Sequence, residues 1–260
     1  MRVLVTNDDG FRAPGLIALV NRLLGAGHRI MVAAPQRQQS GGSAALGRVI
    51  DGASIDWKEF SSPDMPGIEI GLAIDAPPAL AVKVMLSGAF GPPPDVVISG
   101  INRGWNTGSS TLHSGTLGAA MTACSLGWRA AAISCARPPN DNLETASHVA
   151  AAVVELLGDW SGPVAMNVNV PNLAVAKLTG VRCAPIGPQG LLDVEVERDA
   201  DVLRFRLVNR EPAVGSGCDA EAVLGGYVAV SVLDGRYGQL VSGPNMTQEV
   251  EGRLAGALHL

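Results

Sequence analysis

The 260-residue sequence is poor in cysteine and histidine, with four of each, and it has no long uninterrupted apolar run. The cysteines are widely spaced and form no CxxC pair, so neither a zinc cluster nor a dense disulfide framework is indicated. No stretch approaches the roughly 20 apolar residues that a membrane span requires, and the first residues lack the features of a signal peptide. We therefore expect a cytoplasmic protein that does not enter a membrane.

Positive charge is also scarce, because 19 Lys and Arg stand against 24 Asp and Glu, giving a formal net charge of −5. This balance argues against binding of duplex nucleic acid, whose phosphates are held mainly by excess Lys and Arg. The glycine-rich stretch from Gly100 to Gly118 lacks the Lys-Ser/Thr that ends a Walker loop, and it does not follow the first strand as a dinucleotide fingerprint would. The absence of a G-x-S-x-G elbow disfavours a serine hydrolase. ATP and NAD are therefore weak candidates as ligands.

What the sequence does contain is a repeated alternation of strand and helix patterns. Residues 2–6 predict a buried strand, apolar residues from Pro14 to Gly25 recur at helical spacing, and residues 29–35 predict the next strand. We expect further strands at 68–75, 94–100, 130–136 and 164–171, and further helices at 78–90, 114–127 and 142–158. The pattern predicts an α/β fold with a doubly wound, mostly parallel, Rossmann-like sheet over residues 1–172.

The rhythm changes in residues 173–260, which we expect to form a C-terminal extension that completes a single domain. Residues 191–208, "LLDVEVERDADVLRFRLV", alternate apolar and polar side chains around a turn at 199–201, the signature of a β-hairpin. This hairpin either projects from the core or pairs with a second subunit. A short helical turn at 219–225, a strand at 227–233 and a terminal helix at 246–258 complete the prediction.

Two adjacent aspartates, Asp8 and Asp9, directly follow the first predicted strand in "TNDDG". Ligands of open α/β sheets bind beyond the carboxyl ends of the strands. Adjacent carboxylates repel each other unless a cation or a proton neutralises them, and Gly10 allows a sharp turn away from them. The motif therefore predicts either a solvated turn or a site for a divalent cation. Oxygen ligands suit Mg²⁺, Mn²⁺ or Ca²⁺ better than Zn²⁺.

A second candidate segment is "HSGT", residues 113–116, at the start of a predicted helix. Ser114, Gly115 and Thr116 suit either phosphate binding at a helix N-terminus or an ordinary N-cap, and the two roles are compatible. His113 could contact a phosphate or protonate a leaving group, or it could serve only as a structural hydrogen-bonding group. Arg37 and Arg103, in two other polar loops, could offset phosphate charge or simply be exposed.

Four segments in order, "VTNDDGFRAPGL", "VAAPQRQQSGGS", "PDVVISGINRGWNTG" and "HSGTLGAAM", resemble the stationary-phase survival protein SurE family of metal-dependent 5′/3′-nucleotidases. The resemblance implies hydrolysis of nucleoside monophosphates to nucleoside and phosphate, with one divalent cation, Mg²⁺ or Mn²⁺, in each subunit. It implies four metal ligands: Asp8, Asp9, Ser40 and Asn102. It places Ser114, Gly115 and Thr116 near the phosphate, and it implies a homodimer or homotetramer built through the C-terminal arm.

The expected chemistry uses Asp8, Asp9 and Asn102 as catalytic residues, with the cation polarising a phosphoryl oxygen. Two routes are open, attack by water or direct attack by an aspartate on phosphorus. The chain departs from the family pattern at "IDAPPALAV" (74–82) and at Ser110, near the expected substrate. Two alternatives to a nucleotidase follow: a non-catalytic nucleotide or metabolite sensor, and a phosphatase for another small phosphomonoester.

Overall fold

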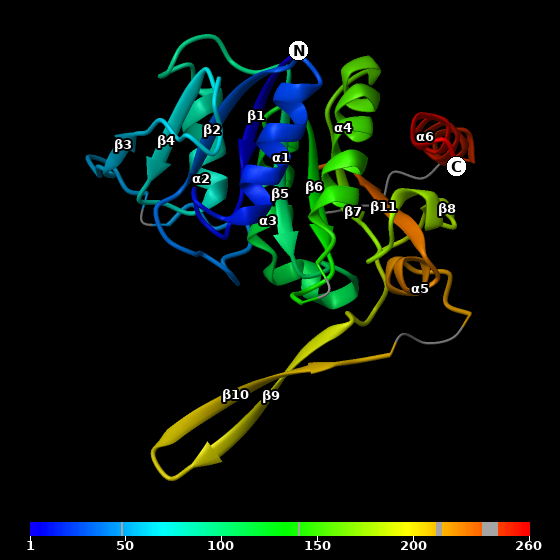
Figure 1. Ribbon diagram of the computed structural model, residues 1–260. Helices are drawn as coiled ribbons and strands as arrows, with labels where there is room; N and C mark the ends of the chain where they lie inside the picture. Colours follow the sequence, from blue (N-terminus) through cyan, green and yellow to red (C-terminus); the bar gives the residue numbers. More distant parts are fainter. Residues whose placement is uncertain (48, 140, 212–214, 236–243) are drawn as a thin grey trace.

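A nine-stranded, mostly parallel sheet forms the centre of the protein (Figure 1). The computed structural model describes residues 1–47, 49–139, 141–211, 215–235 and 244–260. The strand order is β3-β4-β2-β1-β5-β6-β7-β11-β8, in which only β3 and β11 run antiparallel to a neighbour, β4 and β7 respectively. The strands are β1 (Arg2–Thr6), β2 (Arg29–Pro35), β3 (Trp57–Glu59), β4 (Ile70–Ile74), β5 (Val96–Arg103), β6 (Arg129–Cys135), β7 (Val164–Asn169), β8 (Gly180–Cys183) and β11 (Tyr227–Leu233). The predicted doubly wound α/β fold is confirmed.

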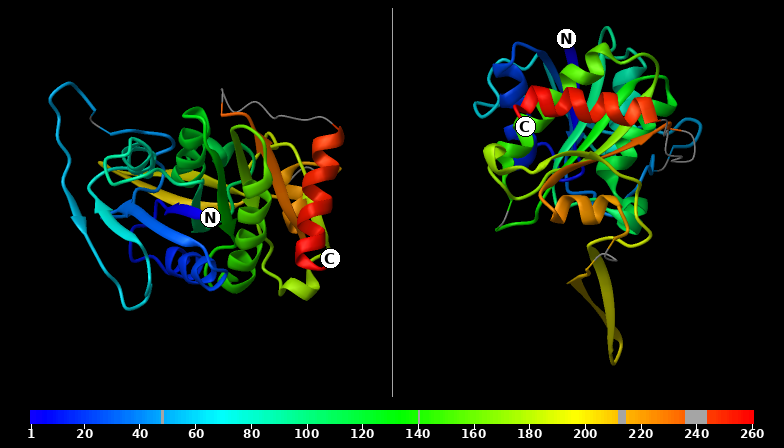
Figure 2. Two further views of the ribbon diagram at one scale, coloured as in Figure 1. Left: turned by 90° about the horizontal axis from the view of Figure 1, so that it is seen from above. Right: turned by 90° about the vertical axis from the view of Figure 1, so that its right-hand side faces the viewer.

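Helices cover both faces of the sheet, as the view from above shows (Figure 2). One core lies between the sheet and three helices, α1 (Pro14–Gly25), α4 (Leu143–Asp159) and α6 (Pro244–Leu258). The other core lies beneath α2 (Pro78–Leu86) and α3 (Gly115–Ser125). Helices on both faces leave no side of a central strand in water, so all five residues of β1 are buried, and its three middle residues are apolar. No helix within the described ranges has both the length and the apolarity to cross a membrane.

The boundaries of the elements differ from the sequence prediction in a few places. The helices α2 and α3 end four and two residues before their predicted ends, each just ahead of a glycine with positive φ, Gly88 (82°) and Gly127 (97°). The sequence did not predict β3, which consists of three residues that are all exposed, or β8, whose four residues are half-buried. Both are edge strands, where the burial pattern that reveals a strand is weakest.

The predicted hairpin is confirmed as β9 (Leu192–Asp199) and β10 (Val202–Asn209), which pair antiparallel. It extends away from the body of the protein, beyond the edge at which the parallel strands end (Figure 1). Beside its base lies the short helix α5 (Asp219–Leu224). The strands β8 and β11, from the predicted extension, join the same sheet as the strands of residues 1–172. The division at residue 172 itself stays a prediction.

Candidate active site

A tight loop at the carboxyl end of β1 holds the two adjacent aspartates. The side chain of Asn7 closes this loop, because its Nδ2 donates to the carbonyl of Gly10 (3.0 Å) and its Oδ1 accepts from the N–H of Gly10 (3.2 Å). Gly10 has φ 101°, a conformation that favours glycine. The N–H of Gln39 donates to the carbonyl of Asp8 (2.7 Å), so the loop after β2 lies against this turn.

The carboxylate of Asp8 is buried against the N-terminus of α3. The hydroxyl of Thr116 donates to Asp8 Oδ1 (2.7 Å), and a Cβ at Gly115 would lie only 2.9 Å from Asp8 Oδ2. Only glycine therefore allows this close approach. Burial raises the pKa of Asp8 above its ordinary value, although hydrogen bonds from Thr116 and from the backbone of Gly115 partly oppose that shift. Ser114 caps the helix by accepting from the N–H of Leu117 (3.0 Å).

Asp9 lies beside Asp8 but is less enclosed. Burial and the negative charge of Asp8 raise the pKa of Asp9 to about 6, against the opposing influence of Arg103 and Gln38. The amide of Gln38 donates both to Asp9 Oδ1 (3.4 Å) and to the hydroxyl of Ser40 (3.0 Å), which places Ser40 next to the aspartate pair. Asp9 Oδ2 is buried and accepts no hydrogen bond within the described residues. A buried carboxylate oxygen without a partner is costly, so this atom is available to a cation or to a hydrogen-bond donor.

Asn102 enters the site from the last residues of β5. The register between β5 and β6 shifts between Ser99 and Asn102, and Gly100 has φ 143° at this irregularity. Such a bulge redirects the side chains that follow it. The amide Nδ2 of Asn102 donates to the carbonyl of Gly104, which leaves Oδ1 as the oxygen that can bind a ligand.

A crevice of about 650 Å³ at this edge of the sheet brings most of the predicted residues together. Its lining includes Asp8, Asp9, Ser40, Asn102, His113 and Ser114. Gly115 and Thr116 lie behind the lining and contact Asp8, so their predicted proximity to a phosphate stays a prediction. Ser110 also lines the crevice, whereas residues 74–82, the other departure from the family pattern, do not.

The sequence analysis named two arginines as possible sources of positive charge, and the structure separates them and adds a third. Arg37 is exposed and does not line the crevice. Arg103 lines it, but its Nε is paired with Asp141 Oδ2 (2.6 Å). Arg137, which the sequence analysis did not single out, lines the crevice and forms no ion pair with any described residue. Its position directly after the strand β6, at the same sheet edge as Asp8, was the signal that could have identified it.

A buried polar network holds the crevice wall from behind, and the sequence did not reveal it. The N–H of Asn106 donates to Asn169 Oδ1 (2.8 Å), and its side chain donates to the hydroxyl of Ser134 (2.9 Å). Asp219, at the start of α5 and with 0% of its surface exposed, accepts from the N–H groups of Gly108 and Gly187, each at 2.9 Å. Asp219 thereby joins the loop before α3 to the segment that leads into the hairpin.

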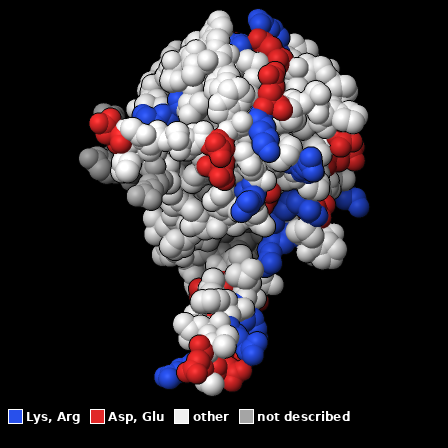
Figure 3. Space-filling view, turned by 90° about the vertical axis from the view of Figure 1, so that its left-hand side faces the viewer, with Lys and Arg blue, Asp and Glu red and all other residues white. Residues whose placement is uncertain are grey.

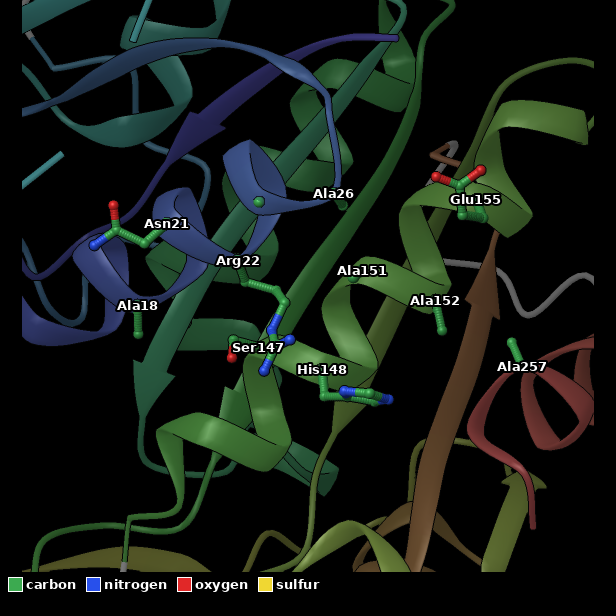
Figure 4. A pocket seen from close by; sticks show the side chains of 11 residues that line it. Ala18, Asn21, Arg22, Ala26, Ser147, His148, Ala151, Ala152, Glu155 and Ala257 are labelled. Atoms are coloured by element: carbon green, nitrogen blue, oxygen red, sulfur yellow. The ribbon is translucent and has the colours of Figure 1, made fainter. Parts of the chain in front are cut away.

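A second cavity of about 630 Å³ lies between α1, α4 and the end of α6, on the face of the sheet that these three helices cover. Figure 4 shows Arg22 extending across it toward Ser147 and His148, among several alanines. It has one carboxylate in its lining, Glu155, and lies away from the carboxyl ends of the strands. The crevice around Asp8 and Asp9 is therefore the better candidate for the active site.

The crevice residues fit a hard divalent cation. Nowhere in the described residues do three or more His, Cys, Asp or Glu side chains gather to hold a metal. A cation at Asp8 and Asp9 would therefore complete its coordination with hydroxyl, amide and water oxygens, the ligands that Mg²⁺ and Mn²⁺ accept. The unpartnered carboxylate Oδ2 of Asp9 and the amide Oδ1 of Asn102 are two oxygens that such a cation could bind.

Comparisons with known proteins identify the family of the chain. The model of the family described as "Survival protein SurE" matches residues 3–191. The 5′-nucleotidase SurE of Desulfitobacterium hafniense is 35% identical over 239 residues, which cover 90% of each chain. The 5′-nucleotidase SurE of Dehalococcoides mccartyi is 33% identical over 264 residues, covering 99% of this chain and 97% of that one. The crystal structure of the SurE protein from Aquifex aeolicus superposes with a TM-score of 0.74 at 26% identity, covering 97% and 99% of the two chains.

We predict that Asp219→Ala destabilises the protein by at least about 2 kcal/mol. The substitution leaves the buried N–H groups of Gly108 and Gly187 without their acceptor, and each unsatisfied group costs about 1–3 kcal/mol. Denaturant unfolding measures this change. The matched control is Asp201→Ala at the exposed hairpin turn, which should stay within about 0.5 kcal/mol of the wild type. Equal effects of the two substitutions would contradict the role given to Asp219.

The stability difference between the wild type and Asp219→Asn should depend on pH. Burial raises the pKa of Asp219 above its ordinary 3.8, and hydrogen bonds from Gly187 and Gly108 offset only part of that shift. The folded protein therefore holds this proton more tightly than the unfolded chain does. The resulting stabilisation is complete below pH 3.8 and is lost as the pH rises through the folded-state pKa. Unfolding of both proteins across this range should show the wild type losing stability relative to Asp219→Asn, and a constant difference would refute the raised pKa.

Proposed function

The chain belongs to the survival protein SurE family, and from this premise we propose that it is a divalent-metal-dependent phosphomonoesterase that hydrolyses nucleoside monophosphates to nucleoside and phosphate. The observation that carries the proposal is the buried, unpartnered Oδ2 of Asp9 beside the buried carboxylate of Asp8. Such a pair at the carboxyl edge of a doubly wound sheet calls for a cation. We also propose a cytoplasmic location.

Asp8, Asp9, Ser40 and Asn102 would supply the oxygen ligands of one Mg²⁺ or Mn²⁺ per subunit. When bound, the cation supplies charge neutralisation and Lewis-acid polarisation of a phosphoryl oxygen. Asp8 is the rigid member of this set, because Thr116 and the start of α3 fix its carboxylate. Ser40 is held near Asp9 through Gln38, which contacts both side chains.

The remaining crevice residues would orient the phosphate and stabilise the charge on its peripheral oxygens. Ser114 caps α3 with its oxygen and keeps its hydroxyl hydrogen for donation into the crevice. Arg137 would add a positive charge to the crevice. Its Cγ and the side chain of Asn102 both lie close to Gly104, because a Cβ placed on Gly104 would be 3.3 Å from Arg137 Cγ and 3.8 Å from Asn102 Nδ2. His113 lines the same crevice and is exposed, which suits proton donation to the leaving oxygen. Phosphoryl transfer depends mainly on such positioning and electrostatic stabilisation.

Release of inorganic phosphate from a panel of nucleoside monophosphates and p-nitrophenyl phosphate tests the proposal, with Mg²⁺, Mn²⁺ or a chelator present. Nucleotide hydrolysis that chelation abolishes supports it. Hydrolysis of p-nitrophenyl phosphate with little nucleotide activity would instead favour a phosphatase for another small phosphomonoester. Nucleotide binding without turnover of any substrate would favour a sensor.

Asp9→Asn should keep the fold and lower metal-dependent turnover by at least about a hundredfold. The substitution removes one carboxylate that the cation requires, and losing one essential electrostatic or acid–base group costs on this scale. Steady-state phosphate release at saturating Mn²⁺ measures the effect, with circular dichroism as the check on folding. Asp201→Asn, at the exposed turn of the hairpin, is the matched control and should retain full activity. An unchanged rate for Asp9→Asn would remove Asp9 from the site.

The hairpin also has a feature that bears on assembly, because its two faces differ in chemistry. On one face, Val194 lies opposite Leu207 and Val196 lies opposite Phe205. These four side chains are between 49% and 69% exposed. The opposite face carries ion pairs, including Arg204 with Asp199 (3.1 Å), and charges of both signs gather near the tip (Figure 3). A long apolar strip of this kind is unusual on a surface that faces only water.

We propose that a second copy of the chain covers the outer pair of this apolar face, Val196 and Phe205, giving a homodimer or homotetramer. The double variant Val196→Ser/Phe205→Ser removes the most exposed cross-strand pair and should shift the protein toward monomer. Val202→Ser, on the charged face and 53% exposed, is the matched control and should leave the assembly unchanged. Light scattering with size-exclusion chromatography measures the mass. A monomeric wild type, or a double variant that keeps the wild-type mass, would contradict this proposal.

A further inference from the structure

The crevice around Asp8 and Asp9 continues beyond Asn102 along a wall that the steps of hydrolysis do not use. Trp105 forms one part of this wall. Three apolar residues at the base of the hairpin form another part: Leu192, Val194 and Leu207. One cavity of about 650 Å³ is thus lined both by the two aspartates and by Trp105 with these apolar side chains, with Asp193 between Leu192 and Val194 in the chain. A ligand that fills it needs an anionic group and an apolar group close together.

Trp105 is held in a fixed orientation. Its indole Nε1 donates to the carbonyl of Val170 (2.7 Å), so one edge of the ring is tied to the chain just after β7. The next residue, Asn106, is anchored through its N–H, its side chain and its carbonyl, which accepts from Asn167 (2.9 Å) and Asn169 (3.0 Å). A ring positioned in advance loses little freedom when it binds a ligand, which favours affinity.

The hairpin side of this wall is apolar and open. Val194 and Leu207 are cross-strand partners, and they remain 49% and 50% exposed although both line the crevice. Their side chains point to the same face of the hairpin, so they present one continuous apolar surface at the level of the crevice. An apolar part of a ligand that binds here would displace water from this surface.

The spacing along the chain links the two ends of the crevice. Trp105 follows Asn102 by three residues, so their Cα atoms lie at most about 11 Å apart. In a nucleoside monophosphate a sugar separates the phosphate from the base, so the two groups could contact these two parts of the crevice. We propose that the base of a nucleoside monophosphate binds against Trp105 and the Leu192, Val194 and Leu207 surface, which makes Trp105 a specificity-determining residue. The proposal rests on the proposed function, because the base belongs to the nucleoside that would be released from the phosphate bound at the same site.

Stacking on an aromatic ring tolerates any base, because every base has a π-face. The Trp105 surface therefore favours nucleotides over non-aromatic phosphomonoesters and discriminates weakly among bases. This differs from recognition by a set of hydrogen bonds, which would select one base strongly.

The experiment measures the KM for AMP together with the Kd of adenosine and the Kd of inorganic phosphate, with Mn²⁺ present throughout. Trp105→Ala should raise the first two values at least about fivefold, the lower end expected for loss of base stacking. Its phosphate Kd and its kcat should stay near those of the wild type. Trp105→Phe keeps an aromatic ring and should stay within about twofold. Trp57→Ala, on the edge strand β3 and 49% exposed, is the matched control and should change nothing.

Val194→Ser supplies a second variant that does not depend on the stability of Trp105→Ala, since Val194 is half exposed on the hairpin. It should also weaken adenosine binding and leave the phosphate Kd unchanged. The inference is overturned if the wild type binds no adenosine, if neither variant alters adenosine binding, or if phosphate binding weakens equally. Adenosine binding that depends on Trp105 without any hydrolysis of AMP would support the inference while contradicting the proposed function.

Discussion

The constraint on which the rest of the site depends is the adjacency of two carboxylates at the edge of the sheet. The turn that Asn7 and Gly10 close prevents Asp8 and Asp9 from separating, and burial removes the water that would screen them. The start of α3 offsets part of the charge at Asp8, and Arg103 does so at Asp9, yet the pKa of Asp9 is still raised to about 6. The free protein thus carries an unfavourable charge arrangement, which the proposed cation would relieve on binding.

A site of this kind requires stiff surroundings, and the chain obtains them from residues far apart in sequence. Asn106 is fixed by Ser134 and Asn169, while Asp219 binds the backbone of Gly108 across 111 positions of the chain. All of these side chains are buried, so their hydrogen bonds do not exchange readily with water. The loop that carries Trp105 is consequently anchored at several points, although loops usually move more than the strands they connect.

Local signals and long-range contacts explain what the sequence could and could not predict. The strand-helix alternation and the hairpin were predictable from their apolar patterns. Strands buried on both faces are almost continuously apolar, whereas the strands of the hairpin alternate apolar and polar residues. Asp8 and Asp9 could be singled out from the sequence, because adjacent carboxylates repel each other unless a cation or a proton neutralises them. Asp219 could not, since its role arises only when distant segments of the chain meet. Arg137 could have been found from its position after β6, at the same edge of the sheet as Asp8. Residues 74–82 do not line the crevice, and whether a residue reaches the crevice depends on the fold rather than on departure from a sequence pattern.

The hairpin connects the site with the surface proposed for assembly. Its apolar face runs without interruption from Val194 and Leu207, which line the crevice, to Val196 and Phe205, which do not. A hairpin without contacts at its far end is a two-stranded ribbon, which by itself is marginally stable in water. Burial of the outer pair against another subunit would hold the ribbon in one position and thereby fix the inner pair against the crevice. The shape of the substrate pocket would then depend on the assembled state, which gives a physical reason for an exposed apolar strip to begin inside an active site.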